Sequence, residues 1–246
     1  MLINNELKEL LSSRMYQTNN GKVFDTPESI LNKHIELLDS YVDDYNYRIK
    51  THVGSVNRNV DNTPNIAYDK VIIEFKLNTF QSTEDYSNMC VVYDLTGKTP
   101  IFKLGVGKTV VTCLNMCIWA DKDLYTHQDY KKLHDKTSEY LSELQDLEDR
   151  YVKFKEKLKN KTLESNQMYK ELGKIIYKTN NNVIRQAVLN AADDLQNSKS
   201  PYYIQDDNTS LWNVYNAVTQ QFSNKLTNGY IDVPSHTLEL SKIIYN

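Results

Sequence analysis

The sequence is poor in glycine, proline and cysteine. Its 246 residues include only 7 Gly, 5 Pro and 3 Cys. Three cysteines are too few, and odd in number, for the disulfide framework of a small secreted protein. The chain shows no cleavable signal peptide and no apolar run long enough to cross a membrane. These absences predict a protein of a reducing cytoplasm that does not associate with membranes.

The remaining composition is that of a folded globular protein. Hydrophobic residues make up 40% of the chain, charged residues 25% and aromatic residues 11%, and the 18 tyrosines add to the volume of the core. The length suits one sizeable core, or one globular domain with a helical appendage. The net charge of −3 provides no general attraction to nucleic acid, so any such binding needs a local basic surface.

An amphipathic helix is predicted over residues 27–43. Thr26 stands at the N-cap position and Pro27 at the first helical position, which together are a common signal for a helix start. The residues that follow repeat apolar side chains at helical spacing, at Ile30, Leu31, Leu37, Leu38 and Tyr41. A shorter helix built on Leu2, Leu7, Leu10 and Leu11 is expected before it.

The spacing of the apolar residues then changes from 3.6 to 2, which is typical of strands with one buried face. This alternation runs through residues 45–53, 71–77 and 89–93. Two more strands are expected at 101–104 and 110–119, with the glycine-rich residues 105–109 as a turn between them. Short connections between the strands favour an antiparallel sheet of four or five strands.

From Tyr130 onward the apolar residues return to helical spacing and predict a long helix to Leu158. Polar residues near position 160 then indicate a turn, so that residues 130–178 would form a coiled-coil-like helical hairpin. The charged residues of 135–149 are mostly acidic and those of 150–178 mostly basic, and folding back would bring opposite charges together. One unbroken helix is the alternative. Further helices are expected at 182–196, 210–226 and 238–244.

These elements predict the α+β class, because the strands precede the long helices and do not alternate with them. We expect a sheet domain over residues 1–125, the helical hairpin over 126–178, and C-terminal helices over 179–246 that pack back on the sheet domain. The helices should therefore follow an antiparallel sheet of four to five strands.

Three motifs that suggest catalysis or metal binding do not meet the requirements of those sites. Gly107-Lys108-Thr109 ends like a P-loop, but Phe102 stands where the first glycine is needed, and β-branched residues follow in place of a helix start. Cys113 and Cys117 could share a strand face, yet zinc needs about four ligands and only His127 is near in sequence. The five histidines are scattered, without a catalytic pattern. We therefore predict a non-enzymatic protein with no catalytic residue, cofactor or metal.

Basic residues are the better functional candidates. Basic and aromatic side chains on one face can bind single-stranded nucleic acid through phosphate contacts and base stacking. The candidates lie on the first two strands and on the basic part of the expected hairpin, at Arg48, Lys50, Lys76, Lys153, Lys155 and Lys157. An ordinary solvated surface is the alternative for the strands, because acidic and basic residues nearly balance over residues 44–108.

Two motifs resemble a known family. The segment from Gly105 to Met116, with Cys113-Leu114-Asn115, and the later segment Thr209-Ser210-Leu211-Trp212-Asn213-Val214-Tyr215-Asn216-Ala217-Val218-Thr219 are similar to motifs of the phage/plasmid-like proteins called domain of unknown function 932. The family pattern Asn-Gly-Leu is here Asn115-Met116-Cys117. Trp212, Asn216 and Thr219 fall on one helical stripe, and we expect buried, structural hydrogen bonding of Asn216 and Thr219 to an adjacent loop or strand.

The resemblance implies an accessory protein of a mobile element and carries no known reaction. The order of helix, antiparallel strands and long helices is also similar in outline to phage single-strand annealing proteins, which assemble as rings on single-stranded DNA. We therefore expect a phage protein of the host-cell cytoplasm that acts in DNA metabolism by binding or annealing single-stranded DNA. We also expect that it can form a homo-oligomer. The alternatives are a host-modulating or anti-defence protein that binds a protein partner, and a small virion component.

Overall fold

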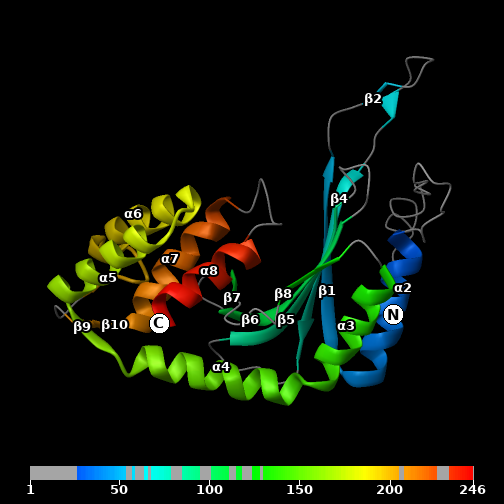
Figure 1. Ribbon diagram of the computed structural model, residues 1–246, viewed down its shortest axis with the longest axis horizontal. Helices are drawn as coiled ribbons and strands as arrows, with labels where there is room; N and C mark the ends of the chain where they lie inside the picture. Colours follow the sequence, from blue (N-terminus) through cyan, green and yellow to red (C-terminus); the bar gives the residue numbers. More distant parts are fainter. Residues whose placement is uncertain are drawn as a thin grey trace. The chain divides into compact units, whose positions relative to one another are not determined.

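The fold combines an antiparallel sheet with a group of helices, which confirms the α+β class (Figure 1). The computed structural model describes the backbone of residues 27–53, 57–58, 64–65, 68–78, 85–94, 101–110, 115–117, 124–127, 130–204, 208–225 and 233–245. The helix expected over residues 2–11 lies outside these ranges. Two compact units are present, each made of segments that are not contiguous in sequence, and each is described by itself.

The main sheet is built from strands close to those predicted. Its order is β1-β4-β5-β6-β7, and β8 pairs with β6. The bounds are β1 (Tyr45–Val53), β4 (Tyr68–Leu77), β5 (Asp85–Asp94), β6 (Ile101–Val110), β7 (Asn115–Cys117) and β8 (Leu124–His127). A separate two-stranded pair joins β2 (Asn57–Arg58) to β3 (Pro64–Asn65).

Unit 1 contains residues 1–75, 90–104 and 125–142, including helices α2 (Pro27–Tyr41) and α3 (Tyr130–Ser142). α2 begins at Pro27, as the helix-start signal predicted. The two helices pack together, and the Oγ1 of Thr137 lies 3.3 Å from Nε2 of His34 in their buried contact. On the strands of this unit, the rings of Tyr45 and Tyr47 pack on Phe75, which is fully buried.

β6 runs through the segment that the sequence predicted to be a turn. Residues 105–109 are buried within one ten-residue strand, and β7 pairs with its end, with Lys108 opposite Cys117 and Val110 opposite Asn115. The prediction of a turn at 105–109 was therefore wrong. Glycine usually signals a turn, but here the glycines occupy buried strand positions beside a lysine whose charge is neutralised by distant carboxylates, as described below.

The long helix expected over residues 130–158 is interrupted at Glu143. α3 ends at Ser142, and α4 (Leu144–Lys159) begins after a single non-helical residue. α3 belongs to unit 1, where it packs on α2, and α4 belongs to unit 2, where it packs on α7. One apolar stripe therefore serves two different packing partners. The turn expected near residue 160 is present, because α4 ends there and α5 begins at Ser165.

Unit 2 contains residues 76–89, 105–124 and 143–246, and its helices surround α7 (Leu211–Lys225). The described side chains of α7 are buried except for the half-buried Asn213 and Gln220, as is usual for a central helix. α6 (Asn182–Gln196), α4 and α8 (Val233–Tyr245) all pack on α7, and α5 (Ser165–Lys178) packs on α6 and α8. The predicted helices at 182–196, 210–226 and 238–244 are confirmed, the last of them with a longer span.

A short strand pair closes unit 2. β9 (Thr162–Glu164), which follows α4, pairs antiparallel with β10 (Asn208–Ser210), which precedes α7. The amide of Leu211 donates to the carbonyl of Lys161 over 2.9 Å and extends this contact. The pair thereby places the end of α4 beside the start of α7.

None of the helices in the described parts of the chain combines the length and the apolar character that a membrane span requires.

Candidate anion-binding site

Three of the predicted basic residues lie on α4, and the structure separates them. Lys153 and Lys157 are both exposed and stand four residues apart, on one face of the helix. Lys155 faces the other way, where its Nζ lies 2.6 Å from the Oδ2 of Asp85. Lys155 is thus engaged in an interior ion pair, whereas Lys153 and Lys157 are presented to solvent.

The predicted basic residues of the sheet belong to different units. Arg48 and Lys50 lie in β1 of unit 1, and their side chains are outside the described part of the structure. Lys76 lies in β4 of unit 2, half-buried, with its Nζ 4.6 Å from the centre of the Tyr86 ring. A cation held over an aromatic face in this way is a common stabilising contact.

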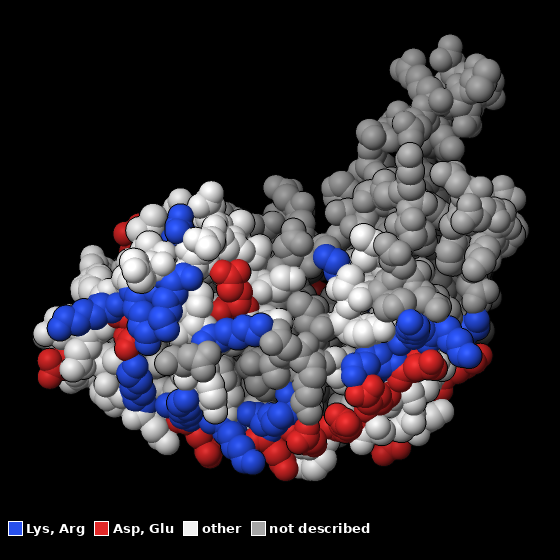
Figure 2. Space-filling model, viewed as in Figure 1, with Lys and Arg blue, Asp and Glu red and all other residues white. Residues whose placement is uncertain are grey.

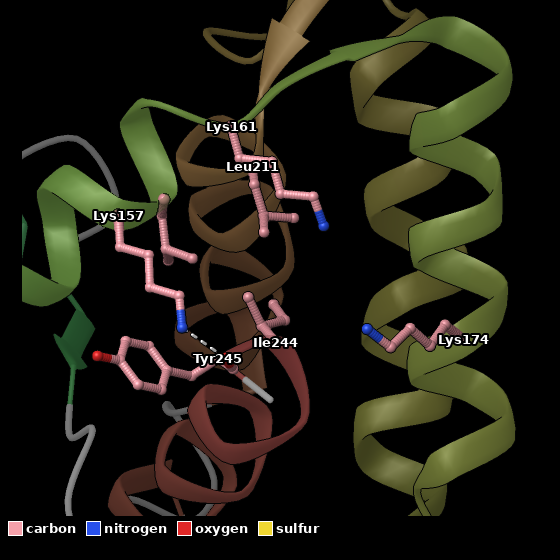
Figure 3. Close-up of a pocket in the computed structure, with 7 residues that line it drawn as sticks. Lys157, Lys161, Lys174, Leu211, Ile244 and Tyr245 are labelled. Carbon is pink, nitrogen blue, oxygen red and sulfur yellow. Dashed lines mark hydrogen bonds between the residues drawn. The ribbon is translucent and has the colours of Figure 1, made fainter.

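A basic pocket lies in unit 2 beside Lys157 (Figure 3). Its volume is about 280 Å³, and its wall is formed by α4, α5, α7, α8 and Lys161, which lies just after α4. Three lysines line it together with three aliphatic residues and one tyrosine: Lys157, Lys161, Lys174, Leu158, Leu211, Ile244 and Tyr245. These residues are called the lysine pocket below.

Lys157 is oriented by the last turn of α8. Its Nζ donates a hydrogen bond to the carbonyl oxygen of Tyr245 over 2.9 Å and lies 3.5 Å from the centre of the Tyr245 ring. A lysine ammonium has three donors. The helix carbonyl takes one of them, so the ammonium is held in place and keeps donors for a ligand.

Glu171 on α5 is the counter-ion of the other two lysines. Its Oε1 lies 2.6 Å from the Nζ of Lys161, and its Oε2 lies 3.7 Å from the Nζ of Lys174. Burial raises the pKa of Glu171, but the hydrogen bonds and charges of the two lysines outweigh this effect and hold the pKa below its ordinary value. Three ammonium groups therefore line the pocket, and one neighbouring carboxylate, that of Glu171, pairs with two of them.

α5 presents further basic and aromatic side chains to solvent. Lys170, Lys174 and Lys178 recur every four residues and so form one stripe along the helix. Tyr177 stands three residues after Lys174 and is 89% exposed. Over residues 150–178 nine basic residues face three acidic ones, and Figure 2 shows lysine and arginine side chains gathered over the helices of this region.

A buried ionic network lies in the interior of unit 2. Lys108 on β6 is fully buried, with its Nζ 2.6 Å from the Oε2 of Glu148 and 3.7 Å from the Oδ1 of Asp85. Asp85 also accepts hydrogen bonds from Tyr151 and Lys155. Burial raises the pKa of Asp85, but these donors and the charge of Lys108 hold it below its ordinary value. Lys108 therefore fastens the sheet to α4 and does not project into a phosphate loop.

The family-like motif residues of α7 are structural. Trp212, Asn216 and Thr219 are all buried, as expected. Asn216 donates to the carbonyl of Trp212, and Thr219 to the carbonyl of Asn216, so these two hydrogen bonds stay within the helix. The link to neighbouring segments comes from Asn213, which donates to the carbonyl of Tyr202 and to the hydroxyl of Thr209. Asn115 lies in β7, and its side chain is outside the described residues.

Sequence reasoning found Lys157 but missed the rest of the lysine pocket. Lys161 and Lys174 were recognised only as members of a basic segment, and Tyr245 was not selected. The pocket brings Tyr245 beside Lys157, 88 residues earlier in the chain. The four-residue spacing of Lys170, Lys174 and Lys178 was the one signal in the sequence that could have placed these lysines on one exposed face.

Comparisons of the chain with protein-family models, with curated proteins and with solved structures found no match.

Proposed function

We propose that this chain is a non-enzymatic, phage-encoded protein that binds single-stranded nucleic acid in DNA metabolism. The contact surface consists of the lysine pocket together with the exposed stripe of α5, namely Lys170, Lys174, Lys178 and Tyr177. This set of residues is called the basic face below. The resemblance to the phage/plasmid-like family, carried by the Trp212 and Asn115 motifs, is part of the proposal.

One observation carries the proposal: an 89% exposed tyrosine stands within a stripe of lysines on α5. Exposing a large aromatic ring to water has no benefit for the stability of a helix. Single-strand binding proteins combine lysines that contact phosphates with aromatic rings on which bases stack. Tyr169 and Tyr245, at 42% and 44% exposed, add two further rings to the same unit.

The charge distribution agrees with this surface although the whole chain is acidic. The net charge is −3, while residues 150–178 carry three times as many basic as acidic side chains. A local positive surface is sufficient for contacts with a phosphate backbone, because charges beyond about 8–10 Å are screened at physiological salt. The acidic remainder of the chain therefore does not cancel the attraction at the basic face.

A salt titration tests the proposal. We expect fluorescently labelled oligothymidylate to bind the protein. Its affinity should fall steeply between about 50 and 200 mM salt, because phosphate contacts weaken as salt rises over this range. The triple change Lys170→Glu, Lys174→Glu and Lys178→Glu should weaken binding and flatten the salt dependence by about two units of slope. Tyr177→Ala should weaken binding about tenfold with the slope kept, because stacking contributes about 1–3 kcal/mol per base.

Matched controls separate local contacts from net charge. Lys131→Glu, Lys132→Glu and Lys199→Glu together change the net charge equally, at exposed residues that are not part of the basic face. Leu189→Ala removes an exposed apolar side chain on α6 in place of the tyrosine ring. If both triple variants bind alike, or if the wild-type protein does not bind at low salt, the nucleic-acid proposal fails. A protein partner would then be the better candidate.

A further inference from the structure

The lysine pocket differs from the stripe of α5 in shape. Outside the pocket, the stripe consists of Lys170, Tyr177 and Lys178, which are exposed on one helix and suited to a strand that passes along it. The pocket is a recess of about 280 Å³ with walls from several elements. A recess accepts the end of a chain more readily than its middle, because a continuous strand must enter and leave.

The pocket also differs from the stripe in charge. Lys157, Lys161 and Lys174 supply three ammonium groups and Glu171 one carboxylate, which leaves an excess of two positive charges. An internal phosphodiester carries one negative charge, whereas a phosphate monoester carries about 1.5–2 at neutral pH. The excess charge of the pocket thus matches a monoester better than a diester.

The apolar residues of the pocket strengthen its attraction for an anion. Leu158 is 1% exposed, Leu211 is 2% exposed and Ile244 is 6% exposed, so the lysines lie beside a buried apolar wall. Charges interact more strongly beside such a surface than in bulk water. The volume is also sufficient, since a water molecule occupies about 30 Å³ of liquid and a phosphate group is only a few times larger.

We propose that the lysine pocket binds a terminal phosphate monoester of a single strand. This inference rests on the proposed function, because the strand that carries the terminal phosphate then continues along the exposed face of α5. The phosphate takes the place of Glu171 as the partner of Lys161 and Lys174. Lys157, held by the carbonyl of Tyr245, contributes the third ammonium group. Glu171 therefore competes with the ligand for Lys161 and Lys174.

Oligothymidylates that differ only at their ends test this assignment. Three strands of one length, with a 5′ phosphate, a 3′ phosphate or no terminal phosphate, compete for the protein against a labelled strand. We expect one or both phosphorylated strands to bind about tenfold tighter than the unphosphorylated strand, as charge-assisted hydrogen bonds would provide. Equal binding of all three strands overturns the inference and leaves the proposed function intact.

Substitutions of the pocket lysines and of Glu171 should change the preference for a terminal phosphate in opposite directions. Lys161→Gln and Lys174→Gln should each reduce the preference for a terminal phosphate. Glu171→Gln should increase it, because the competing carboxylate is removed. Lys170→Gln should weaken the binding of all three strands by the same factor. A purely structural role of Glu171 predicts instead that Glu171→Gln weakens binding of every strand, and this result would refute the displacement.

Thymidine monophosphate, added as a further competitor, distinguishes a phosphate at a strand end from the phosphate of a free nucleotide. If the free nucleotide competes as well as the phosphorylated strand, the pocket is a mononucleotide site and the strand-end assignment is wrong. If no strand binds at low salt, the proposed function fails together with the inference. If the phosphorylated strands bind more tightly than the unphosphorylated strand while the nucleotide competes only weakly, the proposed function and the strand-end assignment are both supported.

Discussion

Tyr151 on α4 donates a hydrogen bond from its hydroxyl to the Oδ2 of Asp85 on β5, over 2.8 Å, and the two residues are only 1% and 3% exposed. The same oxygen accepts from Lys155, and Lys108 lies 3.7 Å from the other oxygen. One carboxylate therefore connects two strands with a helix. A buried charge is tolerated only when it is paired, so this arrangement leads to sharp expectations for its variants.

Lys108→Met should lower the free energy of unfolding by about 3–5 kcal/mol. The change removes the 2.6 Å partner of the partly buried Glu148 and one counter-charge of the buried Asp85, and an uncompensated buried charge is costly. Urea unfolding followed by circular dichroism measures the effect. Lys153→Met, at an exposed position of α4, is the matched control and should change stability by less than about 0.5 kcal/mol. Similar losses in both variants would contradict the role assigned to Lys108.

Asp85→Asn should make stability less sensitive to acid. The pKa of Asp85 is lower in the folded chain than its ordinary value of 3.8. The carboxylate therefore stabilises the fold fully above that value, and the contribution disappears as pH falls through the folded pKa. The difference in unfolding free energy between wild type and variant should be large at pH 7 and shrink below about pH 4. Asp193→Asn, at an exposed site of α6, serves as the control. A difference that stays constant from pH 7 to pH 3 would exclude this linkage.

Asn213→Ala should destabilise unit 2 by about 1–3 kcal/mol. Its amide nitrogen lies 3.1 Å from the Tyr202 carbonyl and 3.0 Å from the Thr209 hydroxyl, and the loss leaves these partly buried acceptors unsatisfied. Asn190→Ala on α6 removes a hydrogen bond only with exposed Gln186, and should change stability by less than about 0.5 kcal/mol. Denaturant midpoints compare the two variants. Equal midpoints would show that Asn213 does not join these segments.

Gly173→Ala should stabilise the protein by about 0.5–1 kcal/mol. The glycine lies in the interior of α5, where it lowers helix stability. A Cβ built at this position meets no atom within 4 Å. Gly173→Val should gain less, because a β-branched side chain loses rotamer freedom in a helix. Thermal unfolding of the three proteins should rank alanine above valine and valine above glycine. A loss of stability in the alanine variant would show that space at this position is needed.

Local sequence patterns predicted much of the fold. α2 follows from Pro27 and the apolar spacing after it, and α6 and α7 follow from stripes that are almost entirely buried in the structure. These elements depend on neighbours a few residues apart, so their periodicity is visible in the sequence.

The misjudged elements depend on distant residues. β6 passes through Lys108 only because Asp85 and Glu148 neutralise its charge, and the former is 23 residues earlier and the latter 40 residues later in the chain. The interruption at Glu143 arises where the chain leaves one compact unit for the other. The lysine pocket needs α4 beside α8. Periodicity contains no information about such pairings.

The pairing of β9 with β10 has a consequence for the order of assembly. It joins residues 44 to 48 positions apart, such as Thr162 and Ser210, and closing a loop of that length costs conformational entropy before the contact is gained. Lys161 and Leu211 flank this closure and both line the lysine pocket. A partly folded chain with separate helices therefore has no complete recess for an anion. A ligand of the pocket binds only the closed chain, so that raising its concentration raises the melting temperature by mass action.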